Sequence, residues 1–334
     1  MLAFKLVYSE EYYLPIGAHV FPAEKYKRIH DRLLKAGIAE PLDFVTPQPA
    51  SDADVLLVHT PQYVHKLRTG TLSAREELEM EIPYSLQLAR AFWLSAGGSI
   101  LAAEYSLIDG IAINIGGGFH HAFPDHGEGF CMIHDVAIAI RRMQRDGKIT
   151  RAMTVDCDVH QGNGTAVIFA GTRTAAGPLP STAGSPQPAG ARTAQATDVF
   201  TISLHQENNY PAWKPPSSID VDLPDKIGDE DYLQWLDNAL SSGLRQFDPE
   251  LICYVAGADP YREDQLGGLS LTIEGLKRRD ELVFRVAKAR GIPVMVTFAG
   301  GYARMVDDTV TIHCNTVIAA REVFREKPMS TPQG

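Results

Sequence analysis

The stretch AMTVDCDVHQGNG (152–164) joins a short apolar run to a polar, glycine-rich segment. Side chains alternate across a strand, so Asp156, Asp158 and His160 are predicted to point to one side where this strand ends. Two carboxylates and one imidazole gathered in this way can bind a divalent metal, whereas a solvated acidic strand end is the alternative. The stretch therefore predicts a buried strand with a candidate metal site at its carboxyl end.

Apolar runs of similar length recur along the chain and alternate with helical patterns. The other predicted strands are DVLLVH (54–59), IAINI (111–115), VFTISL (199–204), LICYVA (251–256) and PVMVTF (293–298). Helices are predicted near residues 23–37, 83–104, 133–147, 230–246, 273–290 and 306–325. Near-continuous apolar strands are buried on both faces, as in parallel sheets, and their alternation with helices is typical of α/β proteins. We expect a single α/β domain over residues 1–334, with a mostly parallel β-sheet sandwiched by helices.

Five of the predicted strands run directly into unusual polar or glycine-rich sequence. These segments are GGGFHH (116–121), DCDVHQGNG (156–164), SLH (203–205), AGADP (256–260) and AGGY (299–302). Ligands of open α/β sheets bind outside the carboxyl ends of the strands, so the five segments should face one pocket. Asp259 then joins Asp158 and His160, and three such ligands leave positions open for water and substrate, as in catalytic zinc sites.

Two further segments supply candidate catalytic side chains. His120 and His121 follow three glycines, and an imidazole at this position could take a proton from metal-bound water and return it to an amine. Tyr302 follows a glycine pair and could donate a hydrogen bond to a polarised carbonyl oxygen. The alternatives are a surface histidine pair and a tyrosine that only packs.

The motifs HH, D-x-D-x-H, G-A-D and G-G-Y, in this order, resemble the pattern of the histone deacetylase family. The segments HQGNG (160–164) and DQLGGLSLTIEGLKRRDELVF (264–284) are similar to class IV members and their bacterial relatives. The resemblance implies an arginase/deacetylase fold with one Zn²⁺ per chain on Asp158, His160 and Asp259. It also implies a deacylase that hydrolyses the amide of acetyl-lysine or longer acyl-lysine in proteins or peptides.

The resemblance assigns a role to each of the remaining site residues. His121 would act as general base and then acid, His120 would act electrostatically, and Tyr302 would stabilise the oxyanion. Asp156 would orient His120, and Asn163 stands beside His121 where class I members have an aspartate. A substrate channel would be lined by Gly129, Phe130 and Leu266. Potassium would contact Asp156, Asp158, His160, Ser203 and Leu204, and an outer potassium site would follow Phe169.

Composition limits the partners and the location of the protein. The chain has 31 basic and 41 acidic residues, a net charge of −10, which argues against binding to nucleic acid or to an anionic membrane surface. We find no leader-like start and no apolar run of membrane-spanning length, so a cytoplasmic protein is expected. Cys131, Cys157, Cys253 and Cys314 lack C-x-x-C spacing and are expected to be buried, reduced thiols. Residues 171–198, rich in Gly, Pro, Ala and Thr, predict a flexible loop.

Three alternative functions remain open at the level of sequence. An acetylpolyamine or other small acylated amine could be the substrate of the same zinc chemistry. An arginase-type hydrolase with two metals would share the predicted fold but would need more carboxylates than AGADP (256–260) offers. A non-catalytic acyl-amine binding protein would keep the fold without turnover.

Overall fold

The computed structural model describes residues 1–170 and 198–325. Their strands form one sheet in which every pairing is parallel, in the order β2-β1-β3-β8-β7-β4-β5-β6. The strands are β1 (Leu6–Val7), β2 (Phe44–Val45), β3 (Ile111–Asn114), β4 (Ala152–Asp156), β5 (Val199–Gln206), β6 (Ile219–Leu223), β7 (Leu251–Val255) and β8 (Val294–Thr297). The predicted α/β class and parallel sheet are confirmed.

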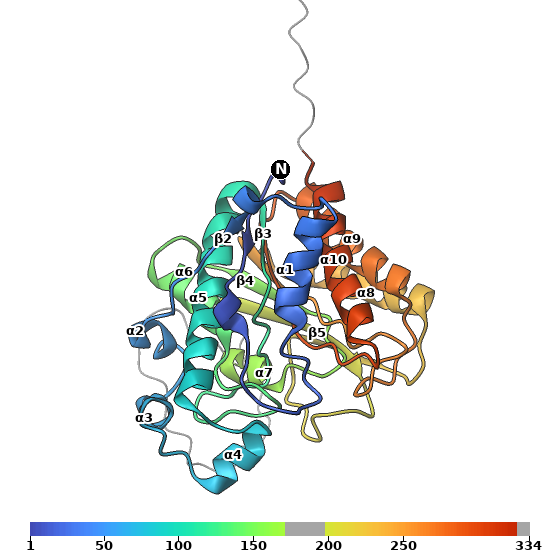
Figure 1. Ribbon diagram of the computed structural model, residues 1–334. Helices are drawn as coiled ribbons and strands as arrows, with labels where there is room; N and C mark the ends of the chain where they lie inside the picture. Colours follow the sequence, from blue (N-terminus) through green and yellow to red (C-terminus); the bar gives the residue numbers. More distant parts are fainter. Residues whose placement is uncertain (171–197, 326–334) are drawn as a thin grey trace, which may run out of the picture.

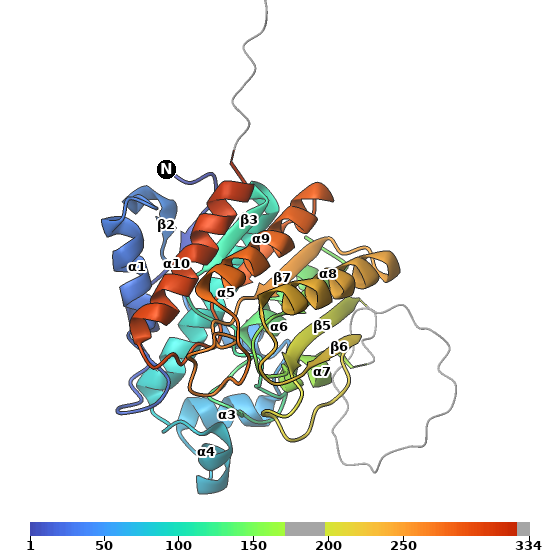
Figure 2. The same cartoon turned by 90° about the vertical axis from the view of Figure 1, so that its right-hand side faces the viewer.

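Helices cover both faces of the sheet (Figure 1). On one face lie α5 (Leu86–Asp109) and α6 (Asp135–Arg145), which pack against each other. On the other face α1 (Lys25–Lys35), α10 (Val306–Val323), α9 (Ile273–Ala289) and α8 (Asp229–Gln246) follow one another as a layer, which Figure 2 shows in front of the sheet. Each of the six predicted helices is present.

Burial on both faces explains the apolar character of the central strands. Every residue of β3, β4, β5, β7 and β8 is buried, because helices lie above and below them. Strand β6 lies at one edge of the sheet and alternates Asp220 and Asp222 with apolar residues, so its sequence carries no long apolar run. Strands β1 and β2 have two residues each. These three strands were not predicted.

The predicted strand DVLLVH (54–59) is wrong. Its first residues belong to α2 (Asp52–Val55), a single helical turn. Ser51 accepts a hydrogen bond from the backbone N–H of Asp54, and the Asp54 carboxylate accepts one from the backbone N–H of Ser51. This reciprocal cap satisfies two N–H groups at the start of a helix, and here it outweighs the β preference of the valines that follow.

Short helices complete the described structure. They are α3 (Pro61–Thr69), α4 (Ala74–Met80) and α7 (Asn163–Phe169), with 3-10 turns at Glu10–Tyr12 and Pro41–Asp43. All four cysteines are buried and unpaired, as predicted. No helix in the described ranges is both long and apolar enough to cross a membrane. Of the loop predicted at 171–198, residues 171–197 lie outside the described residues.

Candidate active site

The carboxyl ends of β3, β4 and β8 open into one pocket. Its walls include residues 117–121 after β3, Asp158 after β4, and Gly300 and Tyr302 after β8. The segment 129–131, which precedes α6, closes another side. Three of the five predicted segments therefore line one pocket, whereas residues 203–205 and 256–260 are not among its lining residues.

Three predicted metal ligands lie together at the floor of this site. Their ligand atoms, from Asp158, His160 and Asp259, all lie within 4.8 Å of one another, and all three residues are buried. His160 Nδ1 is 3.1 Å from Asp158 Oδ1 and 3.3 Å from Asp259 Oδ2. Within residues 1–170 and 198–325 no second cluster of three His, Cys, Asp or Glu side chains offers a comparable metal site.

The surroundings of these ligands fit a bound cation. Oδ2 of Asp259 is buried and has no hydrogen-bond partner within the described structure, although Oδ1 of the same carboxylate accepts the N–H of Val159 at 2.8 Å. Glycines stand beside the carboxylates: a Cβ on Gly300 would lie 2.0 Å from Asp259 Oδ2, and a Cβ on Gly257 would lie 2.6 Å from Asp158 Oδ2. A buried carboxylate oxygen without a donor is expensive, so a cation is the partner that this arrangement lacks.

Electrostatics leads to the same conclusion. Burial, together with the neighbouring Asp158 carboxylate, raises the pKa of Asp259 to about 7. Two buried carboxylates at this separation repel each other, which disfavours the charged form of one of them. A divalent cation between them would offset that repulsion, because it interacts favourably with both.

The two adjacent histidines have different partners and opposite pKa shifts. His120 Nδ1 lies 2.7 Å from Asp156 Oδ2. Burial lowers the pKa of His120, but the negative charges of Asp156 and Asp158 outweigh the effect of burial and raise that pKa to about 9. His121 Nδ1 lies 2.8 Å from Asn163 Oδ1. Burial and the positive charge of His120 lower the pKa of His121 well below its ordinary value. The contacts thus favour the charged form of His120 and the neutral form of His121.

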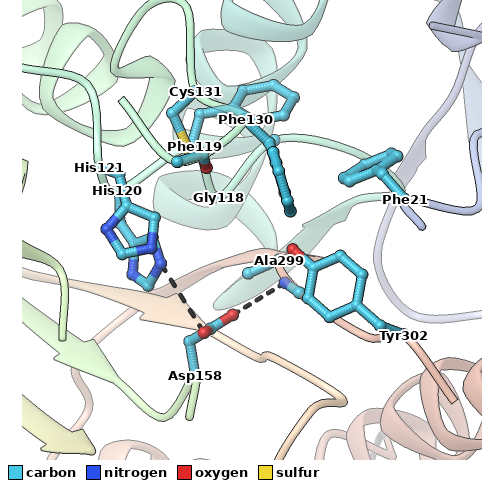
Figure 3. A pocket seen from close by; sticks show the side chains of 13 residues that line it. Phe21, Gly118, Phe119, His120, His121, Phe130, Cys131, Asp158, Ala299 and Tyr302 are labelled. Carbon is cyan, nitrogen blue, oxygen red and sulfur yellow. Dashed lines mark hydrogen bonds and ion pairs between the residues drawn. The ribbon is translucent and has the colours of Figure 1, made fainter. Parts of the chain in front are cut away.

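Tyr302 lies across the pocket from the two histidines, and Figure 3 shows its hydroxyl directed into the pocket. Its backbone N–H donates to Asp264 Oδ2 at 2.7 Å. The other oxygen of Asp264 accepts the N–H groups of Leu266 and Gly267 at 2.8 and 3.0 Å. Asp264 therefore ties the Tyr302 loop to the segment 264–267. The sequence analysis gave Asp264 no role, although it opens the DQLGG motif.

The predicted channel residues divide into two groups. Gly129 and Phe130 line the pocket, and both have left-handed backbone, with φ of 51° and 66°. A Cβ on Gly129 would lie 2.8 Å from the His121 ring, so only glycine lets the segment approach so closely. Leu266 is half-buried and is not among the residues that line this pocket, so its role in a channel stays a prediction.

The predicted potassium ligands lie on neighbouring strands. Asp156 at the end of β4 is in register with Ser203 on β5, and Leu204 follows. Asp158 and His160 are shared with the metal cluster described above. Ser203 Oγ lies 3.0 Å from His205 Nδ1. Potassium binding here stays a prediction, and the segment after Phe169, where the outer site was expected, lies outside the described residues from residue 171.

Two residues of the site were missed by sequence reasoning. The Tyr210 ring stands edge-on to His121, with centroids 5.0 Å apart, and its hydroxyl donates to Glu128 Oε1 at 2.6 Å. Glu128 also accepts from Asn163 Nδ2 at 2.8 Å. Tyr210 comes from the loop between β5 and β6, whose sequence carries no pattern that brings it to the pocket. Glu128 immediately precedes Gly129 and Phe130, two predicted channel residues, so its position in the sequence was a usable signal.

The family model described as the histone deacetylase domain matches residues 19–317. An uncharacterized protein from Picosynechococcus is 38% identical over 97% of this chain and 100% of its own length. Histone deacetylase 2 from Arabidopsis thaliana is 30% identical, over 91% of this chain and 77% of its own length.

Solved structures give the same fold. A crystal structure of a histone deacetylase (HDAC) homolog complexed with SAHA superposes with a TM-score of 0.75, at 23% sequence identity, and covers 97% of this chain and 85% of that one. An HDAC homolog from Aquifex aeolicus gives a TM-score of 0.74 over the same shares. The extent of the family match and the near full-length relatives lead to one conclusion: this chain belongs to the histone deacetylase family.

Proposed function

We propose that this chain is a class IV-like deacylase that uses one zinc ion to hydrolyse the amide of acetyl-lysine or longer acyl-lysine in proteins or peptides. One observation carries the proposal: a pocket lined by a histidine pair and a phenol includes Asp158, which belongs to a buried group of three side chains that could hold a metal ion. The opposite pKa shifts of the two histidines support it. Family membership supports amide hydrolysis as the reaction.

Each side chain has a task that its contacts support. Bound on Asp158, His160 and Asp259, zinc would supply Lewis acidity toward the amide carbonyl and toward water. His121, neutral and hydrogen-bonded through Nδ1, offers its other nitrogen to accept a proton from water and to return it to the leaving amine. The Tyr302 hydroxyl donates a hydrogen bond to the carbonyl oxygen as negative charge develops there.

His120 acts by charge rather than by proton transfer. Its ring lies 4.1 Å from that of His121, and its proton is retained by the contact with Asp156. A fixed positive charge beside the reacting carbonyl stabilises the oxyanion and keeps the neighbouring imidazole neutral.

The walls of the pocket suit an aliphatic chain that ends in an amide. The Phe130 and Tyr302 rings meet edge-to-face with centroids 5.9 Å apart, and Tyr210 flanks His121. Aromatic walls with a few polar groups at the far end favour an extended methylene chain such as that of lysine.

The test combines metal analysis with a series of substrates. The metal content of the purified protein is measured beside kcat/KM for lysine peptides with acyl groups from acetyl to myristoyl, and for acetylpolyamines. Tyr302→Phe should keep the metal and lower kcat by roughly 10²- to 10³-fold, because one oxyanion donor is lost. Asp259→Ala should lose the metal. Tyr105→Phe, on a half-buried tyrosine of α5, is the matched control and should match the parent.

Three results would overturn the proposal. A higher kcat/KM for acetylpolyamines than for every acyl peptide would make the substrate a small acylated amine. Acyl-lysine binding by metal-loaded protein without release of acid would make the chain a non-catalytic binder. Unimpaired hydrolysis by both Tyr302→Phe and Asp259→Ala would mean that the site is assigned wrongly.

A further inference from the structure

Glu128 connects the rim of the pocket to the neutral histidine. Its side chain is 25% exposed and lies immediately before Gly129. Oε1 accepts hydrogen bonds from Asn163 Nδ2 at 2.8 Å and from the Tyr210 hydroxyl at 2.6 Å, and Oε2 lies 3.7 Å from His126 Nε2. The carboxylate is thus fixed by three partners from different segments of the chain.

The orientation of the Asn163 amide follows from its neighbours. The backbone N–H of Gly164 lies 3.0 Å from one amide atom, and because an N–H can only donate, that atom is the oxygen Oδ1. An ionised carboxylate only accepts, so the amide atom facing Glu128 is the nitrogen Nδ2. Two independent contacts therefore require the same orientation of the amide.

This orientation determines the tautomer of His121. The atom 2.8 Å from His121 Nδ1 is the oxygen of Asn163, so Nδ1 must carry the hydrogen. In the neutral ring the remaining nitrogen, Nε2, is then the acceptor. A reversed amide would place an NH₂ group against Nδ1 and would favour the other tautomer, in which Nε2 cannot accept a proton.

The ionisation of Glu128 supports this chain of contacts. Burial raises the pKa of Glu128, but the contact with His126 and the hydrogen bonds from Tyr210 and Asn163 outweigh it and lower that pKa below its ordinary value. The side chain is therefore an anion at neutral pH. A charged acceptor also polarises the amide between it and the histidine, which strengthens the hydrogen bond at Oδ1.

We propose that Glu128 is a positioning residue for deacylation, which acts through Asn163 to hold His121 as the Nδ1–H tautomer with Nε2 free to accept a proton. The uncharged Asn163 leaves His121 without a carboxylate beside it, and Glu128 supplies one at a distance of two hydrogen bonds. The catalytic part of this inference rests on the proposed function, whereas the tautomer does not.

The experiment compares Glu128→Ala and Glu128→Gln with the parent protein loaded with zinc. ¹⁵N spectra of the His121 ring give the tautomer directly, and kcat and KM are measured with an acyl-lysine peptide. Asp125→Asn is the matched control, because it removes a carboxylate of the same loop that does not contact Asn163. Loss of a supporting contact of this kind lowers activity by roughly 10- to 100-fold, so Glu128→Ala should lose about that much kcat with little change in KM.

The conservative variant Glu128→Gln distinguishes loss of the hydrogen bond to Asn163 from a general loss of folding. Gln at 128 keeps an oxygen that can accept from Asn163, so Glu128→Gln should retain the Nδ1–H tautomer and recover most of kcat. Glu128→Ala removes one of the two contacts that orient the Asn163 amide and leaves the one from Gly164, so a fraction of the other tautomer should appear beside the Nδ1–H form. Asp125→Asn should behave as the parent. Unchanged ring spectra and unchanged kcat in Glu128→Ala would overturn the inference. A parent that shows no hydrolysis would overturn the proposed function, and the ring spectra alone would then decide the role of Glu128.

Discussion

Replacing Gly300 by alanine tests whether the two aspartates form a metal site. Gly300 follows β8, and its backbone N–H donates to Asp158 Oδ2 at 2.8 Å. A Cβ at this position would lie 2.0 Å from Asp259 Oδ2 and 2.6 Å from Asp158 Oδ2. The added methyl group therefore occupies the space that the two carboxylates share.

The size of the effect follows from these distances. Even a tight contact of 3.0 Å requires the Asp259 oxygen to retreat by 3.0 − 2.0 = 1.0 Å. The retreat is opposed because the other oxygen of Asp259 is bonded to the Val159 N–H. Metal–ligand distances tolerate only about 0.2 Å, so we expect a loss of metal affinity of at least about 100-fold, or about 2.7 kcal/mol. Overpacking should also lower the free energy of unfolding by about 1–3 kcal/mol.

The assay is a zinc competition titration with a chelator of known affinity, accompanied by metal analysis and thermal unfolding. Gly228→Ala is the control, because a Cβ there meets nothing within 4 Å and its φ of −97° suits alanine. It should keep the zinc affinity of the parent. Gly300→Ala protein that binds zinc within about twofold of the parent Kd would refute the assignment, since the predicted loss is fiftyfold larger than that margin.

Three further predictions follow from the described contacts. Asn163→Asp would place a second carboxylate 2.8 Å from that of Glu128, and because the two repel each other kcat should fall. Adding Glu128→Gln removes one of the two charges and should recover kcat. Equal kcat in the single and the double variant would contradict the contact between residues 128 and 163. Burial lowers the pKa of His59 from 6.5 to about 4, so the unfolded chain binds more protons than the folded chain below pH 6.5. The free energy of unfolding should therefore fall by about 3 kcal/mol between pH 6.5 and pH 4. Denaturant titration measures this fall, which should be shallower in His59→Gln. Zinc at about 1,000 times its Kd should raise the free energy of unfolding by about 4 kcal/mol over protein treated with chelator; unfolding midpoints that do not depend on zinc would show that the folded chain does not bind it.

The central fold was predictable because burial leaves a direct trace in the sequence. Strands such as β4 and β7 are covered on both faces and read as continuous apolar runs. Strands β1 and β2 are too short to leave such a trace, and β6 is an edge strand with acidic residues. The prediction of a strand at residues 54–59 was wrong because the helix signal, the reciprocal cap of Ser51 and Asp54, precedes the valines of that run.

The site was predictable to the extent that it depends on strand ends. His120, His121 and the three proposed metal ligands lie in the segments that follow strands, so the parallel topology brings them together. Tyr210 reaches His121 from a loop whose path depends on tertiary packing. The hydrogen bond between Asn163 and Glu128 depends on side-chain rotamers, for which spacing in the sequence carries no information.

The strand order also determines when the site can form as the protein is synthesised. In the sheet, β7 pairs with β4 on one side and with β8 on the other. In the chain, β7 and β8 both come after β4, so both are synthesised later. A nascent chain that has exposed Asp158 and His160 still lacks Asp259, and Gly300 follows later still. A cation held by these three side chains could therefore bind only after Asp259 has left the ribosome. We expect fragments that stop before β7 to retain no zinc after dialysis.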